Sequence, residues 1–182
     1  MTVATYKWTI DRYHHAVEAG VFDDQPVELL NGELIEMSPE GVPHASLSSD
    51  AGDYLRDRLG SRAKVRDGHP ITLPNNSEPQ PDLAIVDPDG AIYRSHHPYT
   101  ENVFWLIEYS NTSLDKDLKV KSKVYAEANI AEYWVINLRS RELIVFRDPV
   151  NGEYRSRVTL TSGMVSPLSF PDVQIDVLRL IQ

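Results

Sequence analysis

Glu108 and Lys121 are charged residues at positions where the surrounding pattern calls for apolar side chains. Glu108 ends the apolar run Val103–Ile107 in the segment NVFWLIEYS. A carboxylate there is costly to bury unless it is paired or binds a metal ion. The alternative is that the sheet ends near Glu108 and the side chain reaches solvent.

Lys121 lies within a stripe of apolar residues on the helix expected from about Leu114 to Ala128. At about 100° per residue, the inward stripe contains Lys121, and Asp117 lies beside it one turn earlier. An inward lysine needs carboxylate partners, and the strand before this helix ends in Glu108. Otherwise the lysine side chain would extend along the apolar surface to reach the solvent.

The other lysines of this helix are expected on the opposite face. Lys116, Lys119 and Lys123 fall there by the helical angle. Such a face is usually solvated, although these lysines could also meet phosphate groups.

Asp82 is the third candidate. It follows Pro81 and opens a short apolar strand in SEPQPDLAIV. Aspartate before a strand is common as a turn residue, so Asp82 alone is a weak signal. Two carboxylates entering neighbouring strands, with a lysine projecting from the next helix, suit a divalent cation and an attacking water. The sequence therefore predicts a metal-dependent site built from Asp82, Glu108 and Lys121.

The elements that position these residues follow from turn signals and periodicity. Thr9 is a plausible N-cap for a helix over 10–18, Asn31-Gly32 predicts a two-residue hairpin, and a second helix is expected over 45–59. Strands are expected in KVRDGHPITLP, which Asp67-Gly68 and Pro70 break, and in DLAIVD, NVFWLIEYS, EYWVINL, ELIVFRD and GEYRSRVTL, before a short closing element. This order predicts an α/β (α+β) fold in which helices flank a mixed β-sheet.

Composition sets the broad class. The 182 residues fit one domain over 1–182, and the absence of cysteine leaves oxygen and histidine ligands for any metal. The net charge of −9 counts against a large nucleic-acid footprint, although a bound divalent ion would offset part of it. The chain shows neither a signal peptide nor a membrane-spanning run, so a cytoplasmic location without membrane contact is expected.

Four longer stretches carry a resemblance to a known family: VELLNGELIEMSPEGVPH, EPQPDLAIV, WLIEYSNTSLDKDLKVKSKVYAEANIAEYWVI and SPLSFPDVQIDVLRLI. From about residue 8 to the end, the chain resembles the Uma-type "putative restriction endonucleases", a bacterial branch of the PD-(D/E)xK nuclease superfamily. The resemblance implies a restriction endonuclease-like fold and hydrolysis of nucleic-acid phosphodiesters, with DNA as the expected partner. Superfamily enzymes that cut both strands often pair, so a homodimer is plausible.

The resemblance also implies roles for the candidate residues. Asp82 and Glu108 would coordinate Mg²⁺ or Mn²⁺, with the Tyr109 carbonyl as an extra ligand. The superfamily pattern places a lysine two positions after the second acid, where this chain has Ser110. Lys121 matches the displaced lysine of this family and would orient the attacking water or stabilise charge on the phosphate.

Secondary candidates surround this trio. Glu28 and His44 match family positions, and His44 shares a helical face with Ala51 and Leu55, so it either reaches the site or caps the core. Glu78 and Gln80 precede the PD pair and either line the cleft or belong to a polar loop.

Asp117 is expected to hold the Lys121 ammonium in place, because it lies one helical turn earlier.

The sequence leaves two alternatives to a nuclease open. One is a nucleic-acid-binding or assembly module that keeps the fold but lacks activity, which the net charge and the displaced lysine favour. The other is a metal-dependent hydrolase of small phosphate esters, for which an acidic surface is no handicap.

Overall fold

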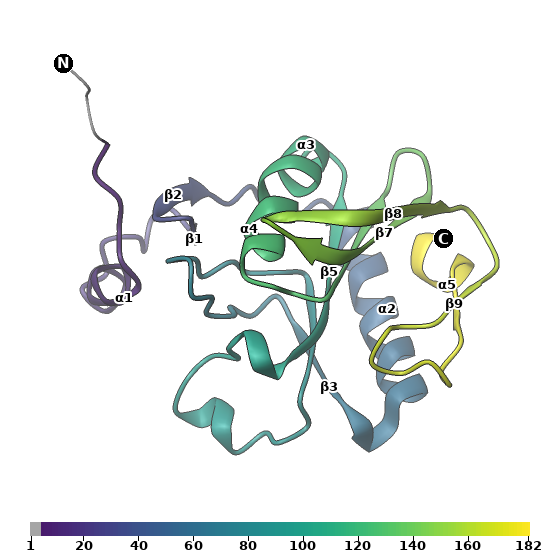
Figure 1. The fold of residues 1–182 in the computed structure, drawn as a ribbon. Coiled ribbons are helices and arrows are strands. Elements are labelled where there is room, and N and C mark those ends of the chain that lie inside the picture. The colour runs from purple at the N-terminus through teal and green to yellow at the C-terminus, as the bar shows by residue number, and fades with distance from the viewer. Residues whose placement is uncertain (1–4) are drawn as a thin grey trace.

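A six-stranded mixed sheet forms the centre of the molecule (Figure 1). The computed structural model describes residues 5–182. Strand order is β3-β4-β5-β6-β7-β8, in which only β5 and β6 pair in parallel. The strands are β3 (Lys64–Asp67), β4 (Leu83–Val86), β5 (Val103–Ser110), β6 (Glu132–Asn137), β7 (Glu142–Val150) and β8 (Glu153–Leu160). The predicted mixed sheet is confirmed.

Helices cover both faces of this sheet, as Figure 1 shows. One face packs against α2 and α5, and the other against the helical segment formed by α3, the π-helical turn η4 and α4. The helices are α1 (Ile10–Glu18), α2 (Val42–Leu59), α3 (Leu114–Lys116), η4 (Asp117–Lys121), α4 (Ser122–Glu127) and α5 (Leu178–Ile181). Short 3₁₀ turns are η1 (Gly60–Arg62), η2 (Ile92–Arg94) and η3 (Thr100–Asn102). Two small antiparallel pairs complete the fold: β1 (Val27–Leu30) with β2 (Glu33–Glu36), and β9 (Met164–Val165) with β10 (Ile175–Asp176).

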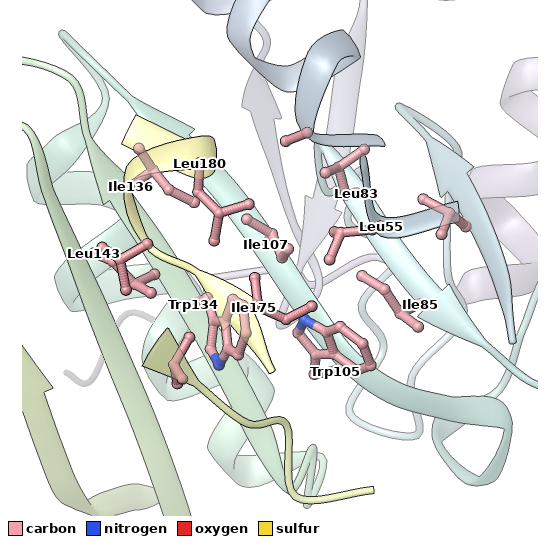
Figure 2. Packing of buried hydrophobic residues seen from close by; sticks show 14 of the residues in the cluster. Leu55, Leu83, Ile85, Trp105, Ile107, Trp134, Ile136, Leu143, Ile175 and Leu180 are labelled. Atoms are coloured by element: carbon pink, nitrogen blue, oxygen red, sulfur yellow. The ribbon is translucent and has the colours of Figure 1, made fainter. Parts of the chain in front are cut away.

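The central strand β5 separates two apolar cores. Trp105 and Ile107 belong to the core beneath α2 and α5, which Figure 2 shows together with Leu55 and Leu180. Leu106 belongs to the opposite core beneath α4. Because side chains alternate along a strand, β5 is covered on both faces, as its apolar run Val103–Ile107 predicts.

Local signals specify the N-terminal elements. The Thr9 hydroxyl accepts a hydrogen bond from the Arg12 amide, so Thr9 caps α1 as expected. Asn31 and Gly32 both have positive φ, 48° and 76°, which a type I′ hairpin requires.

One helix boundary differs from prediction, and one predicted strand break is confirmed. Helix α2 begins at Val42 rather than near residue 45, because Pro43 fits the first turn of a helix. In KVRDGHPITLP the strand ends at Asp67, at the predicted break, because Gly68 adopts a left-handed φ of 56° and Pro70 lacks an amide hydrogen.

Across residues 5–182, no helix is both long and apolar enough to span a lipid bilayer.

Candidate active site

Asp82 directly precedes β4, and Glu108 lies on the adjacent strand β5. Strands β4 and β5 pair with Leu83 opposite Ile107, so one further step of the same register places Asp82 opposite Glu108. The Tyr109 amide donates to Asp82 Oδ2 at 2.6 Å, which fixes that carboxylate at the strand end. Like charges in this relation are unfavourable. The pair therefore favours a bound cation.

Lys121 contacts Glu108 directly. Its ammonium donates to Glu108 Oε1 at 2.8 Å and lies 3.1 Å from Glu28 Oε2, and the residue is only 3% exposed. The Tyr125 hydroxyl also donates to Glu108 Oε1, at 2.8 Å. The inward orientation of Lys121 and its carboxylate partner agree with the helical pattern, and Glu108 is buried rather than solvent-exposed.

The charges of this buried cluster are strongly coupled. Burial raises the pKa of Glu108, and Asp82 adds to the rise, while the Lys121 ammonium opposes it. Burial disfavours the charged form of Lys121, yet the carboxylates of Glu108 and Glu28 raise its pKa above the ordinary value. Lys121 is therefore a permanent ammonium that offsets part of the negative charge of the site.

Glu28 connects two lysines. Its Oε1 accepts a hydrogen bond from the Lys116 ammonium at 2.9 Å, and its Oε2 accepts one from the backbone N–H of Gln80 at 3.3 Å. Burial opposes ionisation, but Lys121 and Lys116 lower the pKa of Glu28. Glu28 on β1 thus connects the β1–β2 hairpin to the helical segment that carries Lys116 and Lys121.

The position of Lys116 corrects the sequence analysis. The uniform helical angle placed it on a solvated face, but its side chain is 28% exposed and reaches Glu28. The reason is the π-helical turn Asp117–Lys121. A π turn has hydrogen bonds between residues five apart, so it changes the angular relation between the residues before and after it. Lys119 and Lys123 are exposed, as predicted.

Asp117 stands at the start of this π turn and is 2% exposed. Its Oδ2 accepts hydrogen bonds from the hydroxyls of Ser110 and Ser113, both at 2.7 Å. The Lys121 ammonium is paired with Glu108 and Glu28 instead. Asp117 therefore joins the end of β5 to the helix, which differs from the expected grip on Lys121.

His44 reaches the site from α2. Its Nε2 lies 3.1 Å from Asp82 Oδ2, and its Nδ1 lies 3.6 Å from Glu40 Oε2. Burial opposes the charged imidazole, but the contact with Asp82 raises the pKa of His44. The earlier start of α2 brings His44 into its first turn. Sequence reasoning missed Glu40, because it lies before the N-cap Gly41 of α2, where the helical spacing rule does not apply.

These side chains open into a cavity of about 500 Å³. Gln80 lines this cavity, which is one of the two alternatives that the sequence left open for it. Glu78 does not: it binds His14 Nε2 at 2.8 Å and the Thr72 hydroxyl at 2.7 Å, outside the cavity. The ionisable lining comprises six carboxylates, two lysines and one histidine: Glu28, Glu36, Glu40, Asp82, Glu108, Asp117, Lys116, Lys121 and His44.

The donor set of this cavity fits a divalent metal ion. Glu40, His44 and Asp82 each offer a ligand atom, and these atoms lie within 4.8 Å of one another. Among the residues described, none donates a hydrogen bond to Glu108 Oε2, so that oxygen is available as well. Carboxylate oxygens suit Mg²⁺ and Mn²⁺, and an imidazole is compatible with transition metals.

The comparisons with known proteins identify a family and a shared fold. Residues 10–178 match the Uma2 family, whose description is "Putative restriction endonuclease". The chain belongs to this family. A solved structure, titled a "putative nuclease belonging to DUF820 from Anabaena variabilis ATCC 29413", has a TM-score of 0.69 at 14% identity. The similarity covers 86% of this chain and 90% of that one, and at this identity it shows a shared fold. No curated protein matches the chain.

Proposed function

We propose that this family member is a metal-dependent endonuclease that hydrolyses the phosphodiester bonds of DNA. The observation that carries the proposal is that Asp82, just before β4, and Glu108 on β5 line one cavity, with Lys121 buried against Glu108. Two opposed carboxylates beside a fixed ammonium suit the binding of a divalent cation and of the phosphate that reacts next to it.

Asp82 and Glu108 would hold Mg²⁺ or Mn²⁺, with the Tyr109 carbonyl as a further ligand and His44 and Glu40 close by. The bound ion would polarise the phosphodiester and lower the pKa of a coordinated water.

Lys121 has a separate role in this proposal. Glu108 and Glu28 hold its ammonium at one position, from which it orients the water or stabilises negative charge that develops on the phosphate. A cation fixed in advance does not have to reorganise during the reaction.

Asp82→Asn tests the proposal with little change in shape. Cleavage of plasmid DNA in Mg²⁺ or Mn²⁺ should fall by at least about a thousandfold, because the metal loses an anionic ligand. Asp57→Asn, at an exposed position on α2, is the matched control and should cleave like the wild type. Full activity of Asp82→Asn, with contaminating nuclease excluded by the purification of both variants, would contradict the assignment.

The substrate is tested with the same preparations. Plasmid DNA, single-stranded RNA and a chromogenic phosphodiester are compared under one metal concentration. Cleavage of DNA in preference to the other two supports the proposal. Turnover of the small ester alone would point to a small-molecule hydrolase, and Mn²⁺ binding without any turnover would point to an inactive module.

The proposal includes a homodimer, because cutting both strands of a duplex calls for two sites. Light scattering coupled to size exclusion measures the mass in solution. A mass near 20.6 kDa, that of one chain, would contradict this part of the proposal.

A further inference from the structure

The two lysines of the cavity differ in their freedom to meet a ligand. The side chain of Lys121 is 4% exposed and contacts two carboxylates. The side chain of Lys116 is 28% exposed, and its one ion pair among residues 5–182 is with Glu28. An ammonium group has three hydrogens to donate. Lys116 therefore combines access to the cavity with unused donor capacity.

The residues before Lys116 add further donors to this wall of the cavity. Asn111 and Thr112 are exposed, line the cavity and lie in the connection between β5 and α3. The Asn111 Oδ1 atom accepts a hydrogen bond from Arg139 Nε at 3.1 Å, so its amide NH₂ remains as a donor. The Thr112 hydroxyl is a further donor.

A polyanion that enters this cavity meets a negative lining. Six carboxylates and two lysines line it. A metal ion would neutralise part of this negative charge next to Asp82. The next phosphate along the bound nucleic-acid strand would still need a cation of its own. Lys116 is the lysine of the lining with an accessible ammonium, and Glu28, itself 1% exposed, holds it in place.

We propose that Lys116, together with Asn111 and Thr112, forms a phosphate-binding subsite for a nucleic-acid phosphate next to the one that is cleaved. The subsite rests on the proposed nuclease function and adds to it. Glu28 acts as a positioning residue, because its carboxylate sets where the Lys116 ammonium lies while Lys121 remains with Glu108.

Lys116→Gln is the informative variant, and Lys119→Gln is its matched control. Lys119 lies three residues further along the same helical segment, is 70% exposed and pairs with Asp115 at 3.0 Å. Binding of a fluorescein-labelled DNA duplex is measured by anisotropy, at several salt concentrations. Ca²⁺ serves as the metal, because it takes oxygen ligands of the same kind.

Lys116→Gln should raise the Kd about tenfold or more, since a charge-assisted hydrogen bond is lost. The slope of log Kd against log salt should fall by about one. Lys119→Gln should keep the wild-type Kd to within about a factor of two. Thermal unfolding checks the fold of each variant, and Lys116→Met, which keeps the aliphatic stem, is used if the glutamine variant is destabilised.

Two results would overturn the subsite. One is a wild-type Kd for folded Lys116→Gln or Lys116→Met. The other is an equal loss for Lys116→Gln and Lys119→Gln, which would indicate a diffuse basic field. The nuclease function is tested separately, by comparing plasmid cleavage by the wild type with that by Asp82→Asn. If the wild type cleaves DNA while Lys116→Gln and Lys119→Gln both bind DNA with the wild-type Kd, the subsite is refuted and the nuclease function stands.

Discussion

Glu108 and Glu132 are buried on the neighbouring parallel strands β5 and β6, but their surroundings are opposite in kind. Glu132 Oε1 accepts hydrogen bonds from Trp134 Nε1 and from Nε and Nη2 of Arg147, at 2.6 to 2.9 Å. Its Oε2 accepts one from the Leu168 amide at 2.7 Å. Both oxygens of Glu132 are therefore occupied by fixed donors.

Glu108 receives its donors on one oxygen and has further carboxylates nearby. Lys121 and Tyr125 both donate to Oε1, and burial, with a smaller contribution from the charges of Asp82, Asp117 and Glu28, raises the pKa of Glu108. The Glu108 site also lines the 500 Å³ cavity, whereas Glu132 does not. A buried carboxylate that is fully paired is costly to remove, because its partners are then left unpaired, while one that faces like charge in a cavity is a candidate for function.

The largest expected effect is on cleavage by Glu108→Gln. Rates should fall by at least about a thousandfold, because the metal loses an anionic ligand. The free energy of unfolding should change little or increase, since Lys121 keeps its contact with Glu28 and repulsion among the acids decreases. Cleavage assays and urea unfolding measure the two quantities. A large loss of stability would show that Glu108 is structural, like Glu132.

Glu132→Gln should show the reverse pattern. Removal of its charge leaves Arg147 partly buried without its partner, and the free energy of unfolding should fall by about 3 kcal/mol. The cleavage rate per folded molecule should match the wild type, because Glu132 lies outside the cavity. Urea unfolding and cleavage at low temperature test both statements. Loss of cleavage in fully folded protein would remove the distinction between the two glutamates.

The sequence predicted Glu108 as a functional residue and made no prediction for Glu132, and the reason is local. Glu108 interrupts a long apolar run, and the helical stripe shows that Lys121 also points inward. Glu132 stands at the start of its strand, where a charge is unremarkable. Its partners Arg147 and Leu168 are distant in sequence, so no local pattern predicts their contacts with Glu132.

The parts of the site that the sequence did not predict depend on irregular or long-range geometry. No residue between 114 and 128 signals the π turn, so a uniform helical angle misplaced Lys116. The contact of Glu28 with both lysines requires the hairpin to lie against the helix, which a sequence pattern does not specify. The sequence left the role of Glu78 open for the same reason, because its partner His14 comes from α1.

Metal addition separates the two glutamates further. Mn²⁺ at about a hundred times its Kd should stabilise the wild type by about 2.7 kcal/mol, if it binds only the folded chain. Glu132→Gln should be stabilised to the same extent relative to its own metal-free state, and Glu108→Gln should gain much less. Thermal unfolding with and without EDTA measures the gain. Equal stabilisation of all three proteins would place the metal away from Glu108.

Tyr125→Phe should have the smallest effect, because it removes one of the two hydrogen bonds to Glu108 Oε1 and leaves Lys121 in place. The free energy of unfolding should fall by about 1 kcal/mol. Tyr125 is buried and is not part of the cavity lining, so cleavage should stay within about threefold of the wild type, a change of less than about 1 kcal/mol in the barrier. If cleavage falls as far as in Glu108→Gln while the fold is intact, the orientation of the Glu108 carboxylate depends on Tyr125 rather than on Lys121. The lysine would then neutralise charge without positioning the ligand.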